Sequence, residues 1–133
     1  MSRGAATDDA LVGAWRELLG DHARAYGAIE RALKAHALGV SEFEVLDQLA
    51  TGDGDERRMH DVGEALHLSQ SALSRVVARL EQEGFATRGL CREDRRGIYV
   101  QITGAGRERY EQAKPDHRAA LAEALGVRFR RTA

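Results

Sequence analysis

Hydrophobic residues in the first third of the chain recur at the spacing of an α-helix. From Asp8 to about His36 they lie on one side of a helical pattern, and they comprise Leu11, Val12, Trp15, Leu18, Leu19, Tyr26, Ile29 and Leu33. No proline interrupts this pattern, although glycines within it weaken the prediction. We therefore expect a loose terminus over residues 1–7 and then one long helix, of the kind that serves in dimer formation or in enclosing a ligand.

A second helix is predicted to follow Gly39. Ser41 and Glu44 have the spacing of a capping box, in which each side chain accepts a hydrogen bond from the other residue's backbone N–H. The apolar face of this helix consists of Phe43, Val45, Leu46 and Leu49. Residues 51–55, in which glycine alternates with aspartate, are expected to form a loop.

Two shorter helices are predicted next, over residues 59–66 and 70–83. The three residues between them form a tight turn, and the last of these, Ser69, is a favourable N-cap for the second helix. That helix has a stripe of apolar residues at helical spacing, namely Leu73, Val76, Val77 and Leu80. Gly84 then ends it in the left-handed conformation that glycine adopts at low cost.

The pattern changes to that of strands after Gly84. Residues 85–91 and 98–102 are predicted to form a hairpin with a charged tip over residues 92–97. Thr103 is expected to cap a helix that runs to about Lys114, where Pro115 stops or kinks it. A further helix is expected over residues 116–125, with a frayed end from Arg128.

These elements predict a mainly α (α+β) fold. Its centre, residues 39–103, is expected to be a winged helix-turn-helix lobe, flanked by helices over residues 1–38 and 104–133 that serve in dimerisation. A chain of 133 residues, 43% hydrophobic and 31% charged, is suited to one domain with such extensions. No window approaches 18 apolar residues, no signal peptide is evident and a single cysteine cannot form an internal disulfide, so we expect a cytoplasmic protein without a membrane span.

Charge is unevenly distributed between the two halves of the chain. Residues 1–66 contain 7 Lys and Arg against 13 Asp and Glu, whereas residues 67–133 contain 13 against 8. The net charges are therefore −6 and +5, which suits an acidic scaffold with a basic contact face, although ordinary scatter of surface charge is the alternative.

The helix over residues 70–83 has the properties of a DNA-recognition helix. Its outward face is small or able to form hydrogen bonds, and it comprises Gln70, Ser71, Ser74, Arg75, Ala78 and Arg79. Such a face fits a major groove about 12 Å wide, where arginine suits guanine and glutamine suits adenine. Ser69 and the helix N-terminus are placed to meet a phosphate. The alternative is a solvated helix face, which explains the arginines but not the capped turn and the charged hairpin.

The hairpin tip is the second candidate DNA contact. Arg92, Arg95 and Arg96 supply positive charge for a minor groove about 6 Å wide. Asp94 would repel phosphate, so we expect it to hold an arginine guanidinium in a fixed direction. The alternative is a solvated turn with compensating charges.

In these segments the chain resembles the MarR family of transcriptional regulators. The resemblance covers residues 41 to about 113 and rests on Ser-Glu-Phe-Glu-Val-Leu at 41–46, Leu-Ser-Gln-Ser-Ala-Leu-Ser-Arg-Val-Val-Ala-Arg-Leu-Glu at 68–81 and Asp-Arg-Arg-Gly-Ile-Tyr-Val-Gln-Ile-Thr-Gly-Ala-Gly at 94–106. The wing pattern of the family is matched by Asp94, Arg96, Thr103 and Gly106.

The resemblance implies a homodimer that binds double-stranded DNA at a pseudo-palindromic site, with half-sites roughly 34 Å apart. It implies that Arg96 enters the minor groove and that Asp94 orients it. It also implies a repressor released by a small phenolic or anionic effector, bound between the dimer helices and the DNA-binding lobe. Little chain follows Gly126 compared with the family pattern, so we expect either a smaller dimer interface or one that rests more on the helix over residues 8–36.

Other candidate sites are less specific. An effector cavity is expected to include Trp15, Arg16, His22, Tyr26 and Tyr110, with dimer packing as the alternative. Cys91 has arginines nearby, so a redox-responsive regulator that uses Cys91 is an alternative function, although a small residue that fits a strand is the simpler interpretation. The histidines lack metal-ligand spacing, and no phosphate loop or nucleophile motif is present, so we expect no metal, no cofactor and no enzyme. A winged-helix module that binds protein instead of DNA is the alternative function.

Overall fold

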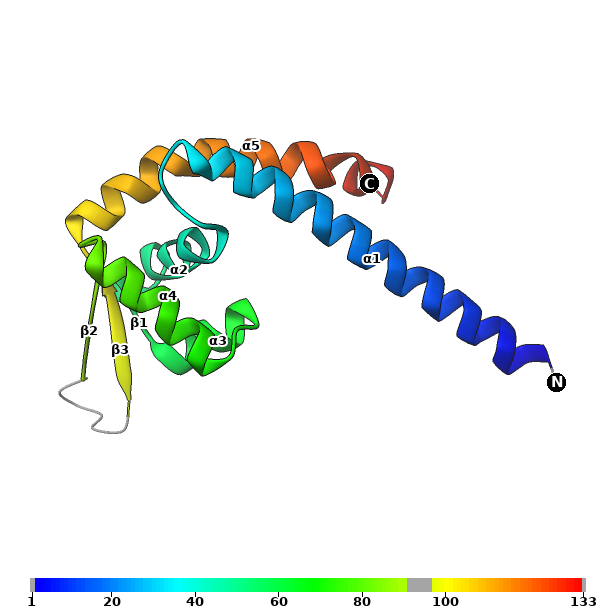
Figure 1. Cartoon of the computed structure of the whole chain (residues 1–133), viewed down its shortest axis with the longest axis horizontal. Helices are drawn as coiled ribbons and strands as arrows, with labels where there is room; N and C mark the ends of the chain where they lie inside the picture. Colours follow the sequence, from blue (N-terminus) through cyan, green and yellow to red (C-terminus); the bar gives the residue numbers. More distant parts are fainter. Residues whose placement is uncertain (1, 91–96, 133) are drawn as a thin grey trace.

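The structure, a computed structural model, describes residues 2–90 and 97–132. Its helices are α1 (Ser2–Lys34), α2 (Val40–Ala50), the 3-10 turn η1 (Asp53–Asp55), α3 (Met59–Leu66), α4 (Gln70–Gln82) and α5 (Gly104–Thr132). Its strands are β1 (Glu56–Arg58), β2 (Ala86–Leu90) and β3 (Ile98–Ile102). Figure 1 shows α2, α3, α4 and the strands gathered into one lobe, with α1 and α5 along one side of it. The predicted mainly α class with a small sheet is confirmed.

The core of the lobe is built from the apolar faces that the sequence pattern predicted. The stripe of α4 is buried, with Leu73, Val77 and Leu80 at 0% exposure, and it packs in one cluster with Phe43 and Leu46 of α2. The flanking helices contribute to the same cluster through Ile29, Leu33, Tyr110 and Ala113. The lobe therefore depends on α1 and α5 for part of its hydrophobic core.

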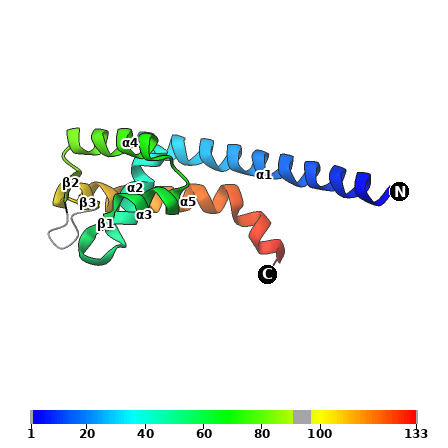
Figure 2. The ribbon, with the colours of Figure 1, turned by 90° about the horizontal axis from the view of Figure 1, so that it is seen from below.

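Helix α1 begins at Ser2, so the expected loose terminus over residues 1–7 is wrong at the level of the backbone. Alanine at positions 5 and 6 favours the helical state, and helix propagation from the following turns costs little. Figures 1 and 2 show the N-terminal half of α1 extending well beyond the lobe.

Helix α2 begins one residue before the expected cap at Ser41. Gly39 occupies the N-cap position, and its backbone N–H donates to Glu42 Oε1 at 3.1 Å. Phe43 N also donates to Gly39 O at 3.0 Å, which places Ser41 inside the first turn. The predicted Ser41–Glu44 capping box is therefore wrong, because Glu42 supplies the carboxylate and Glu44 is free to point elsewhere.

Strand β1 joins the sheet between the predicted loop over residues 51–55 and the predicted helix from residue 59, where the sequence pattern predicted no strand. β1 pairs antiparallel with β3, with Arg57 opposite Val100, and β3 also pairs antiparallel with β2. The described strands thus form a sheet in the order β1-β3-β2. β1 has only three residues and no apolar alternation, so pairing with β3 alone gives it strand geometry.

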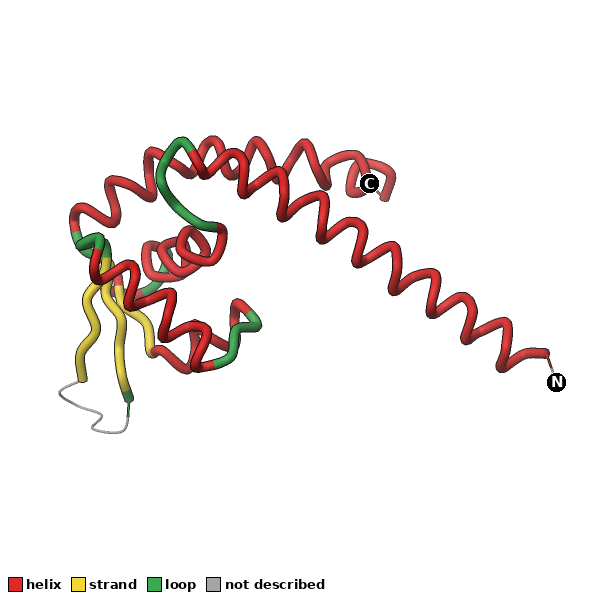
Figure 3. Tube along the Cα trace, viewed as in Figure 1, coloured by secondary structure: helices red, strands yellow, loops and turns green. Residues whose placement is uncertain are grey.

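Helix α5 continues through Pro115, which was expected to stop or kink it, and runs to Thr132. Figure 3 shows this helix without interruption. Proline removes one backbone donor, but the buried residues Ala113 and His117 hold the turns on either side against the lobe. The predicted cap is confirmed, since Gly106 N donates to Thr103 Oγ1 at 3.0 Å. In the described ranges, none of the helices has a stretch apolar and long enough to span a bilayer.

Candidate nucleic-acid interface

The turn between α3 and α4 sets the position of the candidate recognition helix. His67 ends α3 in the left-handed conformation, with φ 56°, and Ser69 Oγ accepts a hydrogen bond from Ala72 N at 3.2 Å. The two helices approach closely at Gly63, where a Cβ atom would lie 2.7 Å from Gln70 Nε2 and 3.2 Å from Leu68 O. A capped turn and a glycine contact therefore hold α4 at a defined angle to α3.

The outer face of α4 is open to solvent. Gln70, Ser71, Arg75 and Arg79 are exposed, whereas Ser74 is half-buried. Figure 2 shows α4 along one edge of the molecule, with no other element outside it among the described residues. A face of this composition on an edge of the lobe is free to enter a groove of a duplex.

Arg88 on β2 connects the hairpin to α4, a contact that the sequence analysis did not identify. Its Nε donates to Glu81 Oε1 at 2.7 Å, and its Nη1 donates to Ser74 Oγ at 3.4 Å. These bonds orient the base of the wing relative to the middle of α4. Arg88 lies on a strand and Glu81 on a helix, so neither the helical nor the strand period relates the two residues. Only the tertiary structure shows this pair.

The wing itself is described up to its tip. The β2–β3 ladder runs from Ala86 opposite Ile102 to Leu90 opposite Ile98. Cys91, Arg92, Asp94, Arg95 and Arg96 fall outside the described residues, and their roles stay predictions.

Towards the tip end of the wing ladder, Arg58 lies over the ring of Tyr99, with its Cζ 5.6 Å from the ring centroid, and donates to the Tyr99 hydroxyl at 3.3 Å. Arg57 of the same short strand donates from Nε to Gln48 O at 2.7 Å. Strand β1 thus anchors the wing to α2.

Tyr110, one of the residues expected in an effector cavity, lies in the core between α2 and α5. It is 2% exposed, packs on Phe43 and donates from its hydroxyl to Asp47 Oδ1 at 2.5 Å. Burial, together with the hydrogen bond to Asp47, raises the pKa of Tyr110 to about 12. Arg118 also donates to Asp47 Oδ1, at 2.8 Å. Burial by itself would lower the pKa of Arg118. The hydrogen bond to Asp47 and its negative charge outweigh this effect, so the pKa of Arg118 is raised.

Two of the expected effector residues line a pocket. His22 and Tyr26 of α1 border a cavity of about 620 Å³, which is also lined by α2 and by His67 and Leu68 of the turn before α4. Trp15 and Arg16 lie on the exposed N-terminal part of α1. The cavity is therefore bordered both by the long helix α1 and by the helix-turn-helix unit.

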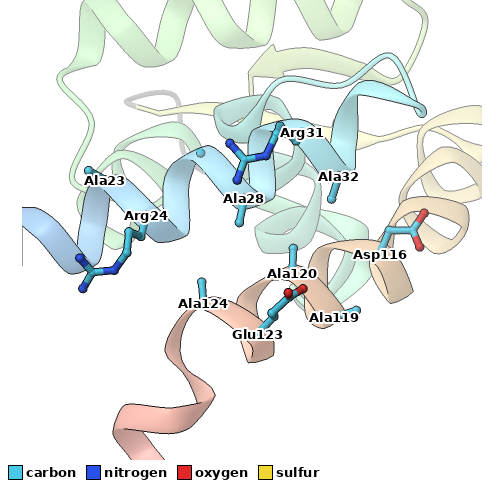
Figure 4. Close-up of a pocket in the computed structure, with 11 residues that line it drawn as sticks. Ala23, Arg24, Ala28, Arg31, Ala32, Asp116, Ala119, Ala120, Glu123 and Ala124 are labelled. Carbon is cyan, nitrogen blue, oxygen red and sulfur yellow. The ribbon is translucent and has the colours of Figure 1, made fainter.

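A second hollow lies between α1 and α5. It has a volume of about 830 Å³, and Figure 4 shows small side chains facing each other across it. The lining is rich in alanine, with Ala23, Ala28 and Ala32 on α1 and Ala119, Ala120 and Ala124 on α5. Charged residues at its border include Arg24, Arg31, Asp116 and Glu123.

The capped α3–α4 turn, the open face of α4 and the adjacent hairpin define a winged helix-turn-helix protein. Residues 38–97 match the model of the MarR family. The HTH-type transcriptional regulator MhqR of Bacillus subtilis is 32% identical over 108 residues, which cover 78% of this chain and 73% of MhqR.

Solved structures show the same likeness. AbsC, a MarR family transcriptional regulator from Streptomyces coelicolor, has a TM-score of 0.78 and 30% identity over 84% of this chain and 76% of AbsC. Sco3205, from the same organism and solved in complex with DNA, has a TM-score of 0.78 and 28% identity over 86% of this chain and 75% of Sco3205. The chain belongs to the MarR family of transcriptional regulators, which are not enzymes.

Proposed function

We propose that this MarR-family regulator is a homodimeric repressor that binds a pseudo-palindromic DNA site and is released from it by a small-molecule effector. The observation that carries the proposal is the open face of α4, which presents Gln70, Ser71 and Arg75 beside a wing. The likeness to Sco3205, which was solved in complex with DNA, supports it.

In this proposal the recognition helix reads bases and the wing contacts the minor groove. Ser69, Gln70, Ser71, Ser74, Arg75 and Arg79 would meet the major groove, and Arg92, Asp94, Arg95 and Arg96 the minor groove. Ser74 accepts a bond from Arg88, so its contact with DNA would also sense the position of the wing. Glu42 lies 4.0 Å from the exposed Arg79, and this weak pair would aim the arginine without preventing contact.

Dimerisation is supported by the apolar face of α1. Exposed large residues follow one stripe of this helix, namely Leu11, Val12, Trp15, Leu18, Leu19 and Tyr26. The same stripe continues into Ile29 and Leu33, which are buried in the chain's own lobe. A helix that projects from the lobe with such a face open to water needs a partner to cover it. The alanine-lined groove between α1 and α5 would admit a helix of the second copy (Figure 4).

The pocket beside the helix-turn-helix unit supports control by an effector. His67 and Leu68 belong to its wall, and they directly precede Ser69, the cap of α4. A ligand that moves this turn would rotate α4 relative to α1, and so change the distance between the two recognition helices of a dimer.

DNA binding is tested with duplexes selected from a random pool. Arg75→Ala is expected to lower affinity for the selected site by about 5- to 150-fold, as loss of one arginine–base contact does. Lys34→Ala, which removes a charge from the exposed end of α1, is the control and should bind like wild type. Affinity that is unchanged in Arg75→Ala and insensitive to salt between 50 and 200 mM would refute sequence-specific binding.

Dimerisation is tested by sedimentation of Leu18→Glu, which places a charge in the exposed stripe. We expect this variant to be monomeric and to lose operator affinity. Ala10→Glu places the same charge on another face of α1 and should remain dimeric. A wild-type chain that sediments as a monomer at micromolar concentration would refute the proposed dimer.

A further inference from the structure

The chemistry of the pocket between α1, α2 and the α3–α4 turn differs from that of an anion-binding site. Its lining combines apolar residues, which include Ile29, Val40 and Leu66, with His22, Tyr26 and Glu44. No lysine or arginine occurs among the described residues that line it. Arg16, the cation that the sequence analysis expected there, belongs to the exposed part of α1.

Glu44 is the acidic residue among the described residues that line the pocket. Its Oε1 lies 3.2 Å from His117 Nε2, and the other ring nitrogen of His117, Nδ1, lies 2.8 Å from Arg118 Nη1. A guanidinium only donates, so Nδ1 must accept and Nε2 carries the proton that His117 donates to Glu44. Arg118, the nearby cation, is paired with Asp47 at 2.8 Å, and the charge of Glu44 also contributes to the raised pKa of Arg118.

We infer that this pocket takes a small aromatic cation, such as an aryl amidine or aryl amine, rather than the anionic ligand that the family resemblance implied. The cationic group would pair with Glu44, and the ring would lie against Tyr26 and His22, whose ring centroids are 5.8 Å apart on consecutive turns of α1. A volume of about 620 Å³ is sufficient for a ligand with two fused rings.

This inference rests on the proposed function, because it names the class of effector that would act on the DNA-binding lobe. A cation held by Glu44 of α2 and by the rings of α1 would lie against His67 and Leu68, the two residues before the cap of α4. The ligand would therefore contact α1, α2 and the α3–α4 turn together.

The test uses three probes of nearly the same shape that differ in charge, namely 2-naphthamidine, 2-naphthamide and 2-naphthoate. Binding to the full-length protein is measured by titration calorimetry near pH 7.5, without DNA. We expect the amidine to bind at least tenfold more tightly than the amide, and the naphthoate to bind more weakly than either. Glu44→Gln should remove the preference for the amidine.

The glutamine variant is expected to fold, because its side-chain oxygen still accepts from His117 Nε2 and its volume is nearly unchanged. Thermal unfolding of the variant checks this directly. Glu30→Gln removes the same charge from an exposed site on α1 outside the pocket and should keep the amidine preference. Retention of the preference in Glu44→Gln, equal binding of amidine and amide, tighter binding of naphthoate, or no binding of any probe would each overturn the inference.

Operator binding, measured on the same samples with and without amidine, separates this inference from the proposed function. A wild-type protein that binds no duplex refutes the regulator, whatever the probes do. Amidine that binds through Glu44 and leaves operator affinity unchanged supports the ligand class and refutes its role as the effector.

Discussion

Among the glycines whose surroundings the structure describes, Gly106 leaves the least room for a side chain, so Gly106→Ala tests how α5 joins the lobe. A Cβ atom at this position would lie 2.1 Å from Phe85 O, 2.9 Å from Phe85 C and 3.0 Å from Ile102 Cγ1. The nearest obstacle is backbone, so it cannot be relieved by a change of rotamer. The first turn of α5 must instead move about 1 Å away from the start of β2.

That displacement would strain two hydrogen bonds that connect the start of α5 to the residues before β2. Thr103 N donates to Phe85 O at 3.0 Å, and Thr103 Oγ1 donates to Gly84 O at 2.6 Å. Overpacking of a core costs about 1–3 kcal/mol, and a weakened hydrogen bond adds about 1 kcal/mol. We therefore expect Gly106→Ala to lower the free energy of unfolding by about 3 kcal/mol, which lowers Tm by roughly 10 °C.

Gly104→Ala is the matched control, two residues away on the same helix. A Cβ atom at Gly104 meets nothing within 4 Å. Both substitutions restrict the unfolded chain equally, so Gly104→Ala should stabilise the protein by about 0.4–1 kcal/mol. Thermal and urea unfolding are followed by circular dichroism at one protein concentration, because the stability of a dimer depends on concentration. If the two variants unfold within about 0.5 kcal/mol of each other, the steric argument is refuted.

Three further predictions follow from local geometry. Ser69→Ala removes the cap of α4 and should cost about 1 kcal/mol by urea unfolding, whereas Ser69→Asp should retain stability. His67 has a φ of 56°, so His67→Gly should be at least about 1 kcal/mol more stable than the β-branched His67→Val in thermal unfolding. The raised pKa of Tyr110, about 12 in the folded state against 10.0 ordinarily, stabilises the fold fully below pH 10, and this contribution is lost as pH rises towards 12. Tyr110→Phe should lack this alkaline loss when denaturant unfolding is compared between pH 8 and 12.

Each of these predictions has a result that contradicts it. Equal stabilities of the alanine and aspartate variants at position 69 would mean that the cap contributes nothing. A valine at position 67 as stable as glycine would mean that the left-handed turn is not constrained. Parallel pH profiles for wild type and Tyr110→Phe would mean that the phenol ionises in the fold as it does in water.

The helix-turn-helix unit and the two wing strands could be predicted from the sequence alone. A stripe of apolar residues at helical spacing, a serine cap and a glycine stop are local signals, and α4 shows all three, including Ser69 and Gly84. The same holds for the Thr103 cap of α5. The family resemblance could be recognised in these segments because the residues that contact one another within them are close in the sequence.

Features that depend on distant residues could not be predicted in this way. The polar strand β1 exists because it pairs with β3, more than 40 positions later in register, and α5 continues through Pro115 because its neighbours are buried. Tyr110 is an aromatic residue of the kind that lines a cavity. In the structure it lies in the core, and its hydroxyl donates to Asp47, which is 63 positions away in the chain. The sequence by itself determined the helix-turn-helix unit, the two wing strands and the cap of α5, because those depend on local spacing and caps. Only the tertiary structure decided that Glu44, and not Arg16, lines the pocket, because that depends on how α1 packs against α2.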